Sequence, residues 1–259
     1  MNQPLAYIHP DAKIAQNVVI EPFATIHKNV VIGEGTWIGA NAVINEGARI
    51  GKNCKIFPGA IISSIPQDLK FKGEETTAEI GDNTVIREFV TISRGTVDKY
   101  TTVIGKNCLI MAYVHVAHDC IIGDNVLLVN AVQLAGHVQI EDFAIVGGGS
   151  VVHQFVRIGP HVIIAGGSLI GKDVPPYSKA AREPLRYCGI NSVGLRRRGF
   201  TNDQINDIQE VYRQLYFKGY NTSAALEKIE LECPPSKERD IILHFIRSSE
   251  RGVMKGIEV

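Results

Sequence analysis

The stretch "VIGEGTWIGANAVINEGARIGKNC", residues 31–54, decides the fold of this 259-residue chain. Isoleucine recurs in it at every sixth position, and a small residue stands two positions before each isoleucine. A period of six matches neither the 3.6 residues of an α-helical turn nor the heptad of a coiled coil. The stretch therefore predicts a solenoid of short parallel strands, in which each six-residue unit turns one large and one small apolar side chain inward.

The same six-residue frame extends far beyond this stretch in both directions. Large aliphatic residues occupy its positions from Ile8 to Ile170, and only Asp68, Glu74 and Asp98 break the series. A glycine often follows the large aliphatic residue, and we expect the chain to turn tightly at these glycines. Three units make one triangular coil of 18 residues, and successive coils are expected to stack at roughly 4.8 Å.

The frame also divides the chain into two parts. Two polar stretches, residues 63–79 and 93–103, interrupt it as loops, and loops on a rigid scaffold commonly carry binding residues. Pro175 and Pro176 mark the exit from the solenoid. From about Thr201 the apolar residues follow a helical period, with Thr201 or Asn202 as the N-cap, and residues 241–246 indicate a last helix. We predict a solenoid domain over residues 1–190 and a small helical domain over residues 191–259.

The composition excludes several classes of protein. Lys plus Arg and Asp plus Glu each number 27, so no charge excess favours nucleic acid or an anionic membrane. No run approaches the roughly 18 apolar residues of a membrane-spanning helix, and "MNQPLAYIHP" lacks the pattern of a secretory signal. The five cysteines have no framework spacing, which indicates reduced thiols and a cytoplasmic protein.

The stretch "VHVAHDCIIGDNV", residues 114–126, holds polar residues that the frame does not require. Because the frame is unbroken from 104 to 170, residues 18 apart should lie one above the other. His118 then stacks over Gly136 and Gln154, and Asp119 stacks over His137. His115 and His153 are expected close to the same column, so four of the eight histidines gather at one corner.

Three interpretations of this column compete. Three histidines can hold zinc or another divalent ion, as in a metal-dependent hydratase of the carbonic anhydrase type. The corner residues of a non-enzymatic scaffold can simply point into water. Alternatively, Asp119 fixes the tautomer of a basic His118, and the N–H of Gly136 faces an oxyanion. Acyl transfer to a hydroxyl needs a base beside an oxyanion donor and a zinc site does not, so the pattern favours catalysis.

Several motifs are shared with one family. They are "QDLKFKGE" (67–74), "IREFVTISRGT" (86–96), "HVAHDC" (115–120), "LAGHV" (134–138), "GGGSVVHQF" (147–155), "KDVPPY" (172–177) and "GLRRRGF" (194–200). Over essentially its whole length the chain resembles the UDP-N-acetylglucosamine O-acyltransferases, which belong to the hexapeptide-repeat acyltransferases and begin lipid A synthesis. The resemblance implies an all-β solenoid of the left-handed parallel β-helix type, followed by a small α-helical domain and assembled as a homotrimer.

The resemblance also implies the catalytic roles. His118 becomes the general base that deprotonates the glucosamine 3-hydroxyl, which attacks the thioester of an acyl carrier protein. Asp119 orients His118, and the N–H of Gly136 stabilises the oxyanion. No metal or separate cofactor is implied, because phosphopantetheine carries the acyl donor. An N-acyltransferase of the same pathway is disfavoured, since that family has an extra N-terminal domain and the frame here begins at Ile8.

The substrate-binding residues are likewise implied by the resemblance. Asp68 is expected to reach the acyl 3-hydroxyl and Lys70 the sugar nucleotide. The sugar site is expected to include His115 and His137, and its nucleotide end His153 and Gln154. The remaining predicted contacts are Asn191 and Arg198 to the nucleotide, Arg197 to phosphopantetheine, and Gly166, whose missing side chain leaves the acyl groove open for a long chain. Ser93, Val193 and residues 180–188 depart from the family pattern near the nucleotide site.

Overall fold

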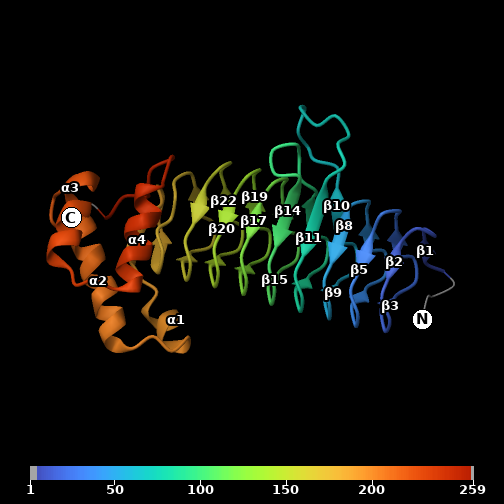
Figure 1. Ribbon diagram of the computed structural model, residues 1–259, viewed down its shortest axis with the longest axis horizontal. Helices are drawn as coiled ribbons and strands as arrows, with labels where there is room; N and C mark the ends of the chain where they lie inside the picture. The colour runs from blue at the N-terminus through green and yellow to red at the C-terminus, as the bar shows by residue number, and fades with distance from the viewer. Residues whose placement is uncertain (1–4, 258–259) are drawn as a thin grey trace.

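The chain forms a parallel β-helix capped at its C-terminal end by helices, and the structure, a computed structural model, describes residues 5–257 (Figure 1). The first sheet contains β1 (Tyr7–Ile8), β4 (Thr25–Ile26), β7 (Val43–Ile44), β10 (Ile61–Ser64), β13 (Thr91–Ser93), β16 (His115–Val116), β19 (Gln133–Leu134), β22 (Val151–Val152) and β25 (Leu169–Ile170). The second contains β2 (Lys13–Ile14), β5 (Val31–Ile32), β8 (Ala48–Ile50), β11 (Thr77–Ile80), β14 (Thr101–Ile104), β17 (Ile121–Ile122), β20 (Gln139–Ile140) and β23 (Arg157–Ile158). The third contains β3 (Val19–Ile20), β6 (Trp37–Ile38), β9 (Lys55–Ile56), β12 (Val85–Ile86), β15 (Leu109–Ile110), β18 (Leu127–Leu128), β21 (Ile145–Val146), β24 (Ile163–Ile164), β26 (Ser178–Ala181) and β27 (Arg186–Ile190).

The three sheets enclose a triangular prism whose edges are the corners between strands. We call them the first, second and third edge, after the sheet that leads into each. Residues 117–120, 135–138 and 153–156 lie on the first edge, because they follow β16, β19 and β22. The second edge includes residues 141–144 and 159–162, and the third includes residues 147–150 and 165–168.

The register of the strands confirms the 18-residue stacking. Val116 pairs with Leu134, and Leu134 pairs with Val152. At the first loop Ile61 pairs with Thr91, 30 residues later, so this loop adds 12 residues to its coil. At the second loop Thr91 pairs with His115, 24 residues later, which adds six. The loops are shorter than predicted, residues 65–76 and 94–100, because the flanking residues of both predicted loops belong to paired strands.

The core consists of the two series of inward residues that the sequence predicts. The large series is buried from Ile20 onward, and the small series, including Thr36 and Ala144, is buried with it. Cys54, Cys108 and Cys120 fill small positions, and burial raises the pKa of the Cys108 thiol to about 11. At roughly 25 cal/mol per Å² of apolar surface, this continuous core is the main stabilising contribution of the solenoid.

The repeated glycines have a different cause from the one predicted. Gly33, Gly51 and Gly105 do not have positive φ; the left-handed residue of each corner lies two positions later, as at Asn53 (φ 53°) and Asn107 (φ 56°). A Cβ on Gly105 would lie 2.5 Å from the carbonyl oxygen of Gly123 on the next coil. Glycine is therefore required there by the close approach of two backbones, not by the turn.

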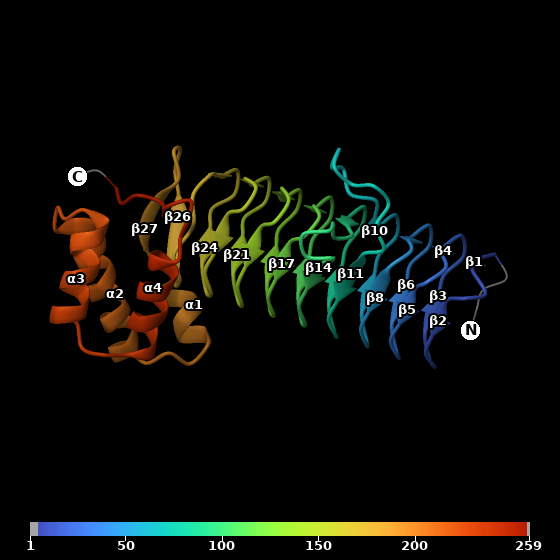
Figure 2. The same cartoon turned by 45° about the horizontal axis from the view of Figure 1, so that its top comes forward.

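The helical part contains α1 (Ser192–Arg197), α2 (Asn202–Phe217), α3 (Thr222–Glu232) and α4 (Lys237–Arg247), beyond the antiparallel β26–β27 hairpin (Figure 2). The periodicity predicts α2 and α4 but misses α1, α3 and the hairpin. Thr201 is the N-cap of α2, and it forms a capping box with Gln204. The predicted boundary at 190/191 stays a prediction, and residues 1–4 and 258–259 of the predicted domains lie outside the described residues.

Two polar contacts fasten the helical part to the last coils. The Arg157 guanidinium donates to the Ser248 carbonyl oxygen at 3.1 Å and lies over the Phe245 ring. The buried Asp173 carboxylate accepts the Arg157 backbone N–H and the Ser249 hydroxyl. Within residues 5–257, no helix combines the length and the apolar character needed to cross a membrane.

Replacement of Gly105 by alanine is expected to destabilise the solenoid by about 1–3 kcal/mol, because the new methyl group overlaps the next coil. Gly171 is the matched control: it occupies the same frame position, has ordinary φ, and a Cβ there meets nothing within 4 Å. The free energies of unfolding in urea check the difference. Equal values for Gly105→Ala and Gly171→Ala would contradict this account of the glycines.

Candidate active site

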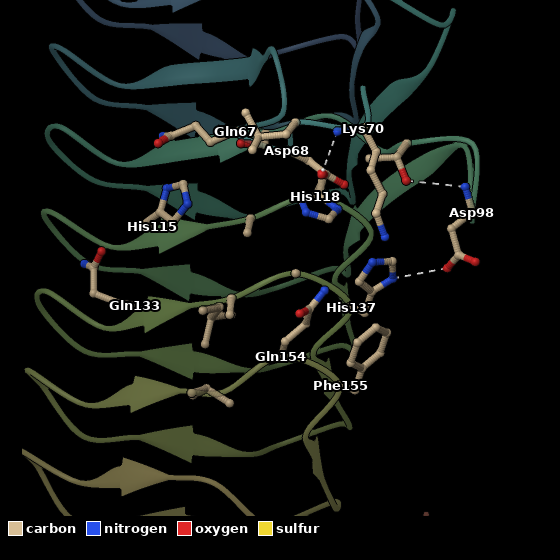
Figure 3. Close-up of a pocket in the computed structure, with 18 of the residues that line it drawn as sticks. Gln67, Asp68, Lys70, Asp98, His115, His118, Gln133, His137, Gln154 and Phe155 are labelled. Atoms are coloured by element: carbon tan, nitrogen blue, oxygen red, sulfur yellow. Dashed lines mark hydrogen bonds and ion pairs between the residues drawn. The ribbon is translucent and has the colours of Figure 1, made fainter. Parts of the chain in front are cut away.

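A cavity of about 930 Å³ lies at the first edge of the prism, below the two loops (Figure 3). The loop of residues 65–76 covers one side of it, and the loop of residues 94–100 closes another. Seven predicted site residues line it together: Asp68, Lys70, His115, His118, Gly136, His137 and Gln154. The column predicted from the 18-residue stacking therefore opens into the largest cavity described.

His118 and Asp119 form a buried ion-pairing contact at the wall of this cavity. The His118 Nδ1 atom lies 2.8 Å from the Asp119 Oδ2 atom. His118 is 8% exposed, and Asp119 is 0% exposed. Asp119 has φ 59°, a left-handed conformation that aspartate tolerates better than most residues. The carboxylate thus sits behind the imidazole, away from solvent.

The second loop supplies most of the bonds to the Asp119 carboxylate. The Thr96 backbone N–H donates to Oδ1 at 3.0 Å, and the Thr96 hydroxyl donates to Oδ2 at 2.7 Å. The Lys99 backbone N–H donates to Oδ1 at 3.2 Å. Burial acts to raise the pKa of this carboxyl, but the hydrogen bonds from Thr96, His118 and Lys99 outweigh it and hold the pKa below its usual range.

Gly136 lies directly beneath the His118 ring, one coil farther along the solenoid. A Cβ at position 136 would lie 2.7 Å from the His118 Cε1 atom and 2.8 Å from Nε2. Among residues 5–257, no hydrogen bond is made by the Gly136 N–H. The missing side chain therefore leaves both the imidazole face and a backbone donor accessible.

His137 lies one coil below Asp119 and completes a ladder of rings. Its ring is perpendicular to His118 at 5.1 Å and stacks on Phe155 at 4.6 Å. The His137 Nδ1 atom lies 3.1 Å from the Asp98 Oδ2 atom. Burial lowers the pKa of His137 despite the nearby Asp119 and Asp98 carboxylates, so this imidazole is neutral near neutral pH.

His115 stands on β16 at the other side of the cavity. Its Nδ1 atom lies 2.7 Å from the Thr91 hydroxyl on the preceding coil. Burial, and then the neighbouring His118, lower its pKa. Figure 3 shows Gln133 one coil below it and Asp68 and Lys70 on the loop facing His118 and His137. Asp68 accepts the Lys70 backbone N–H at 3.0 Å, which shapes the loop.

The other predicted residues lie away from this cavity. His153 is on the first edge but exposed, with its Nδ1 atom 3.1 Å from the Gln154 carbonyl oxygen. Gly166 lies on the third edge, where a side chain would meet the Gly148 carbonyl oxygen. Asn191, Arg197 and Arg198 lie at α1, beside the second edge. In one chain, the predicted residues therefore occupy three different edges.

At the second edge, a stack of rings supports α1. His161 stacks between Phe143 at 4.9 Å and Tyr177 at 5.6 Å. Asn191 caps α1 and donates to the His161 carbonyl oxygen at 2.9 Å, and Arg198 donates to the Phe143 carbonyl oxygen. Burial, with a contribution from the Arg198 cation, lowers the pKa of His161 to about 4.

The structure brings together one group of side chains that can hold a metal ion. His118, Asp119 and His137 offer ligand atoms within 4.8 Å of one another. His115 and His153, which the hydratase interpretation requires as possible ligands, do not belong to this group. The predicted set of histidine ligands is therefore only partly assembled.

Sequence reasoning missed the residues that hold the catalytic pair. Thr96, Asp98 and Lys99 contact Asp119 or His137 from the second loop, and Thr102 accepts the Asp119 backbone N–H at 2.8 Å. The six residues added by this loop break the 18-residue arithmetic, so stacking does not place them. The polar character of the loop was the available signal.

The repeats and the C-terminal part each match a known family. The description "Bacterial transferase hexapeptide (six repeats)" matches residues 29–64 and 101–136. The description "Udp N-acetylglucosamine O-acyltransferase; Domain 2" matches residues 173–254. A hexapeptide solenoid with a buried histidine–aspartate pair at an open cavity defines a hexapeptide-repeat transferase.

Curated relatives narrow this class. An acyl-[acyl-carrier-protein]–UDP-N-acetylglucosamine O-acyltransferase from Aquifex aeolicus is 58% identical over 76% of this chain and 76% of its own length. One with the same name from a Sulfurihydrogenibium species is 55% identical over 74% of this chain and 72% of its own length. The chain therefore belongs to the UDP-N-acetylglucosamine O-acyltransferase family and is an acyltransferase.

Crystal structures agree with this membership. The UDP-N-acetylglucosamine acyltransferase of Bacteroides fragilis is 54% identical, superposes with a TM-score of 0.96, and is covered completely by 98% of this chain. The enzyme of Francisella novicida is 45% identical with a TM-score of 0.95, over 98% of this chain and 94% of its own. The predicted fold class, a left-handed parallel β-helix followed by helices, is confirmed. The relatives favour acyl transfer over a metal-dependent hydratase.

Gly136→Ala is expected to lower acyltransferase activity at least about 100-fold, because the new methyl group displaces the His118 ring. Initial rates measure the loss, and thermal unfolding shows whether the fold remains intact. Gly171→Ala is again the control and should retain full activity. Wild-type activity in Gly136→Ala would show that the ring is not held against this glycine.

His161→Phe is expected to flatten the pH dependence of stability. Because the pKa of His161 lies at about 4 in the folded chain and at 6.5 otherwise, the unfolded chain takes up the proton first as the pH falls. The wild-type free energy of unfolding should therefore fall by about 1–2 kcal/mol more than that of the variant between about pH 7 and pH 5. Urea unfolding at the two pH values measures this, and equal slopes would contradict it.

Proposed function

We propose that this chain transfers an acyl group from an acyl carrier protein thioester to the 3-hydroxyl of UDP-N-acetylglucosamine, the reaction that begins lipid A synthesis. One observation carries the proposal: the buried His118–Asp119 pair, 2.8 Å apart, faces an open cavity above Gly136. Relatives that are 55% and 58% identical carry the name of this reaction. A cytoplasmic location follows from the carrier protein that delivers the donor.

His118 acts as the general base. Its Nδ1 atom is engaged by Asp119, so Nε2 is the nitrogen available to the cavity. Nε2 takes the proton of the sugar hydroxyl while the hydroxyl oxygen attacks the thioester carbonyl carbon. Asp119 orients the imidazole and stabilises the imidazolium that forms. When the carbon–sulfur bond breaks, His118 returns the proton to the phosphopantetheine sulfur, and no resident metal or separate cofactor is consumed.

The Gly136 N–H stabilises the charge that develops on the carbonyl oxygen. It lies beneath the His118 ring and makes no hydrogen bond within residues 5–257. A backbone donor that is already in place stabilises an oxyanion without any rearrangement during the reaction. Base and oxyanion donor thus belong to adjacent coils of the solenoid.

The first loop and the flanking histidines bind the substrates. Lys70 supplies a positive charge for the diphosphate of the sugar nucleotide, and Asp68 accepts a hydrogen bond from the acyl 3-hydroxyl. His115 and His137 line the sugar site as neutral imidazoles, since burial lowers the pKa of each. Gln154, below Gly136, faces the nucleotide end of the cavity.

A homotrimer completes the site. The remaining predicted contacts, His153, Gly166, Asn191, Arg197 and Arg198, lie outside the cavity of the single chain. Solenoids that pack side by side would bring the other edges of one copy against the first edge of its neighbour. The open groove at Gly166 then accommodates a long acyl chain, and the cationic end of α1 binds the nucleotide and the phosphopantetheine arm.

His118→Ala is expected to reduce acyl transfer by at least about 1,000-fold, because it removes the base while leaving the oxyanion donor in place. His244→Ala is the matched control, since His244 is an exposed histidine on α4. Purified variants are assayed with UDP-N-acetylglucosamine and a panel of acyl carrier protein thioesters, with and without a 3-hydroxyl. Size-exclusion chromatography verifies that both variants keep the wild-type assembly.

Substantial transfer by folded His118→Ala would overturn the proposed mechanism. Transfer to the 3-amino analogue of the sugar, but not to UDP-N-acetylglucosamine, would instead correct the acceptor. Release of free acid rather than an acylated sugar would identify a hydrolase and refute the proposed function.

A further inference from the structure

The second loop leaves the Asp119 carboxylate only one free position for His118. A carboxylate has about four lone-pair positions, two on each oxygen. The backbone N–H groups of Thr96 and Lys99 donate to Oδ1 at 3.0 Å and 3.2 Å. The Thr96 hydroxyl occupies one position of Oδ2 at 2.7 Å, and His118 Nδ1 approaches the same oxygen at 2.8 Å. Thr96 and His118 therefore share one carboxylate oxygen.

The direction of the Thr96 hydroxyl is itself determined by the loop. The Asp98 backbone N–H donates to the Thr96 oxygen at 3.3 Å, which leaves its O–H to point at Asp119. Thr96 is 6% exposed, so solvent does not replace it as a donor. Within the catalytic pair, Asp119 follows His118 directly at a corner, and its carboxylate rotates about bonds that the strand pairing does not restrain.

We propose that Thr96 is a positioning residue for the general base. Its hydroxyl occupies the second position of Oδ2 and so restricts Asp119 to a single bond with Nδ1–H of His118. The imidazole is thereby held in the tautomer whose Nε2 lone pair faces the cavity. This inference rests on the proposed function, because it assigns Thr96 a role in activating the base of that reaction.

Removal of the hydroxyl has a predictable effect on the pH dependence of the reaction. The Thr96 hydroxyl withdraws charge from the carboxylate, since its hydrogen bond favours the ionised form. Without it, more negative charge faces His118, and the imidazolium becomes easier to form. The acidic limb of the pH–rate profile then moves to higher pH. The other titratable groups around the site are unchanged by the substitution; they are Asp68, Lys70, Glu74, Asp98, Lys99, His115 and His137.

Thr96→Val tests the hydroxyl alone, because valine keeps the shape and the backbone N–H. We expect kcat to fall about 10-fold to 100-fold, the range for losing a hydrogen bond to a charged group, with KM changed less than about threefold. The acidic limb should move to higher pH. Thr96→Ser restores the hydroxyl and should recover kcat to within about threefold of wild type. Thr101→Val, on β14 nearby, is the control, since its hydroxyl contacts only the Thr102 carbonyl oxygen.

Wild-type kcat and pH profile in Thr96→Val would overturn the proposal, as would a serine variant no better than valine. Nitrogen NMR of imidazole-labelled wild-type protein gives a test that needs no variant to fold. Above the titration of His118, its Nδ1 should carry the proton; a proton on Nε2 would refute the inference. The His118→Ala assay separates the two proposals: if that variant is inactive while Thr96→Val is normal, only the role of Thr96 is wrong.

Discussion

The hydrogen bonding between successive coils is the constraint on which the rest of the structure depends. Each strand is two to five residues long and is stable only because its backbone groups pair with the strands above and below. This pairing brings the coils so close that a Cβ at Gly105 or Gly123 would overlap the neighbouring coil. It also stacks His118 on Gly136 and Asp119 on His137. The same spacing that stabilises the solenoid therefore sets the distances of the candidate active site.

The second loop contributes what the repeat itself cannot. A uniform stack of coils presents each corner residue to water, where an aspartate at a left-handed corner has no fixed rotamer. The loop of residues 94–100 covers Asp119 with donors and makes it fully buried. An ionised group at such a position is tolerable only because its acceptors are satisfied. Catalytic geometry thus arises where a regular scaffold is interrupted, and the regular part supplies the rigidity.

The periodic features of the chain were predictable, and the irregular ones were not. The six-residue frame predicts the core, the stacking and the column of His118, Gly136 and Gln154, because one distance along the chain corresponds to one distance in space. Thr96 and Asp98 lie in an insertion where this correspondence fails. Helix α3 was missed because Asn221 is a weak signal beside a short apolar face, and α1 because a single buried residue, Leu195, anchors it. The arrangement of three edges around one site depends on neighbouring copies, which stacking within one chain does not describe.

The two loops add 12 and six residues to their coils, and both lengths are whole multiples of the repeat. The chain therefore re-enters the solenoid in phase, and every later side chain faces the same way as it would without the loop. An insertion of one residue would instead rotate the histidine column out of its edge and place polar groups in the core. Loop length in this architecture is quantised: whole hexapeptides can be looped out or taken back while the active site downstream keeps its orientation.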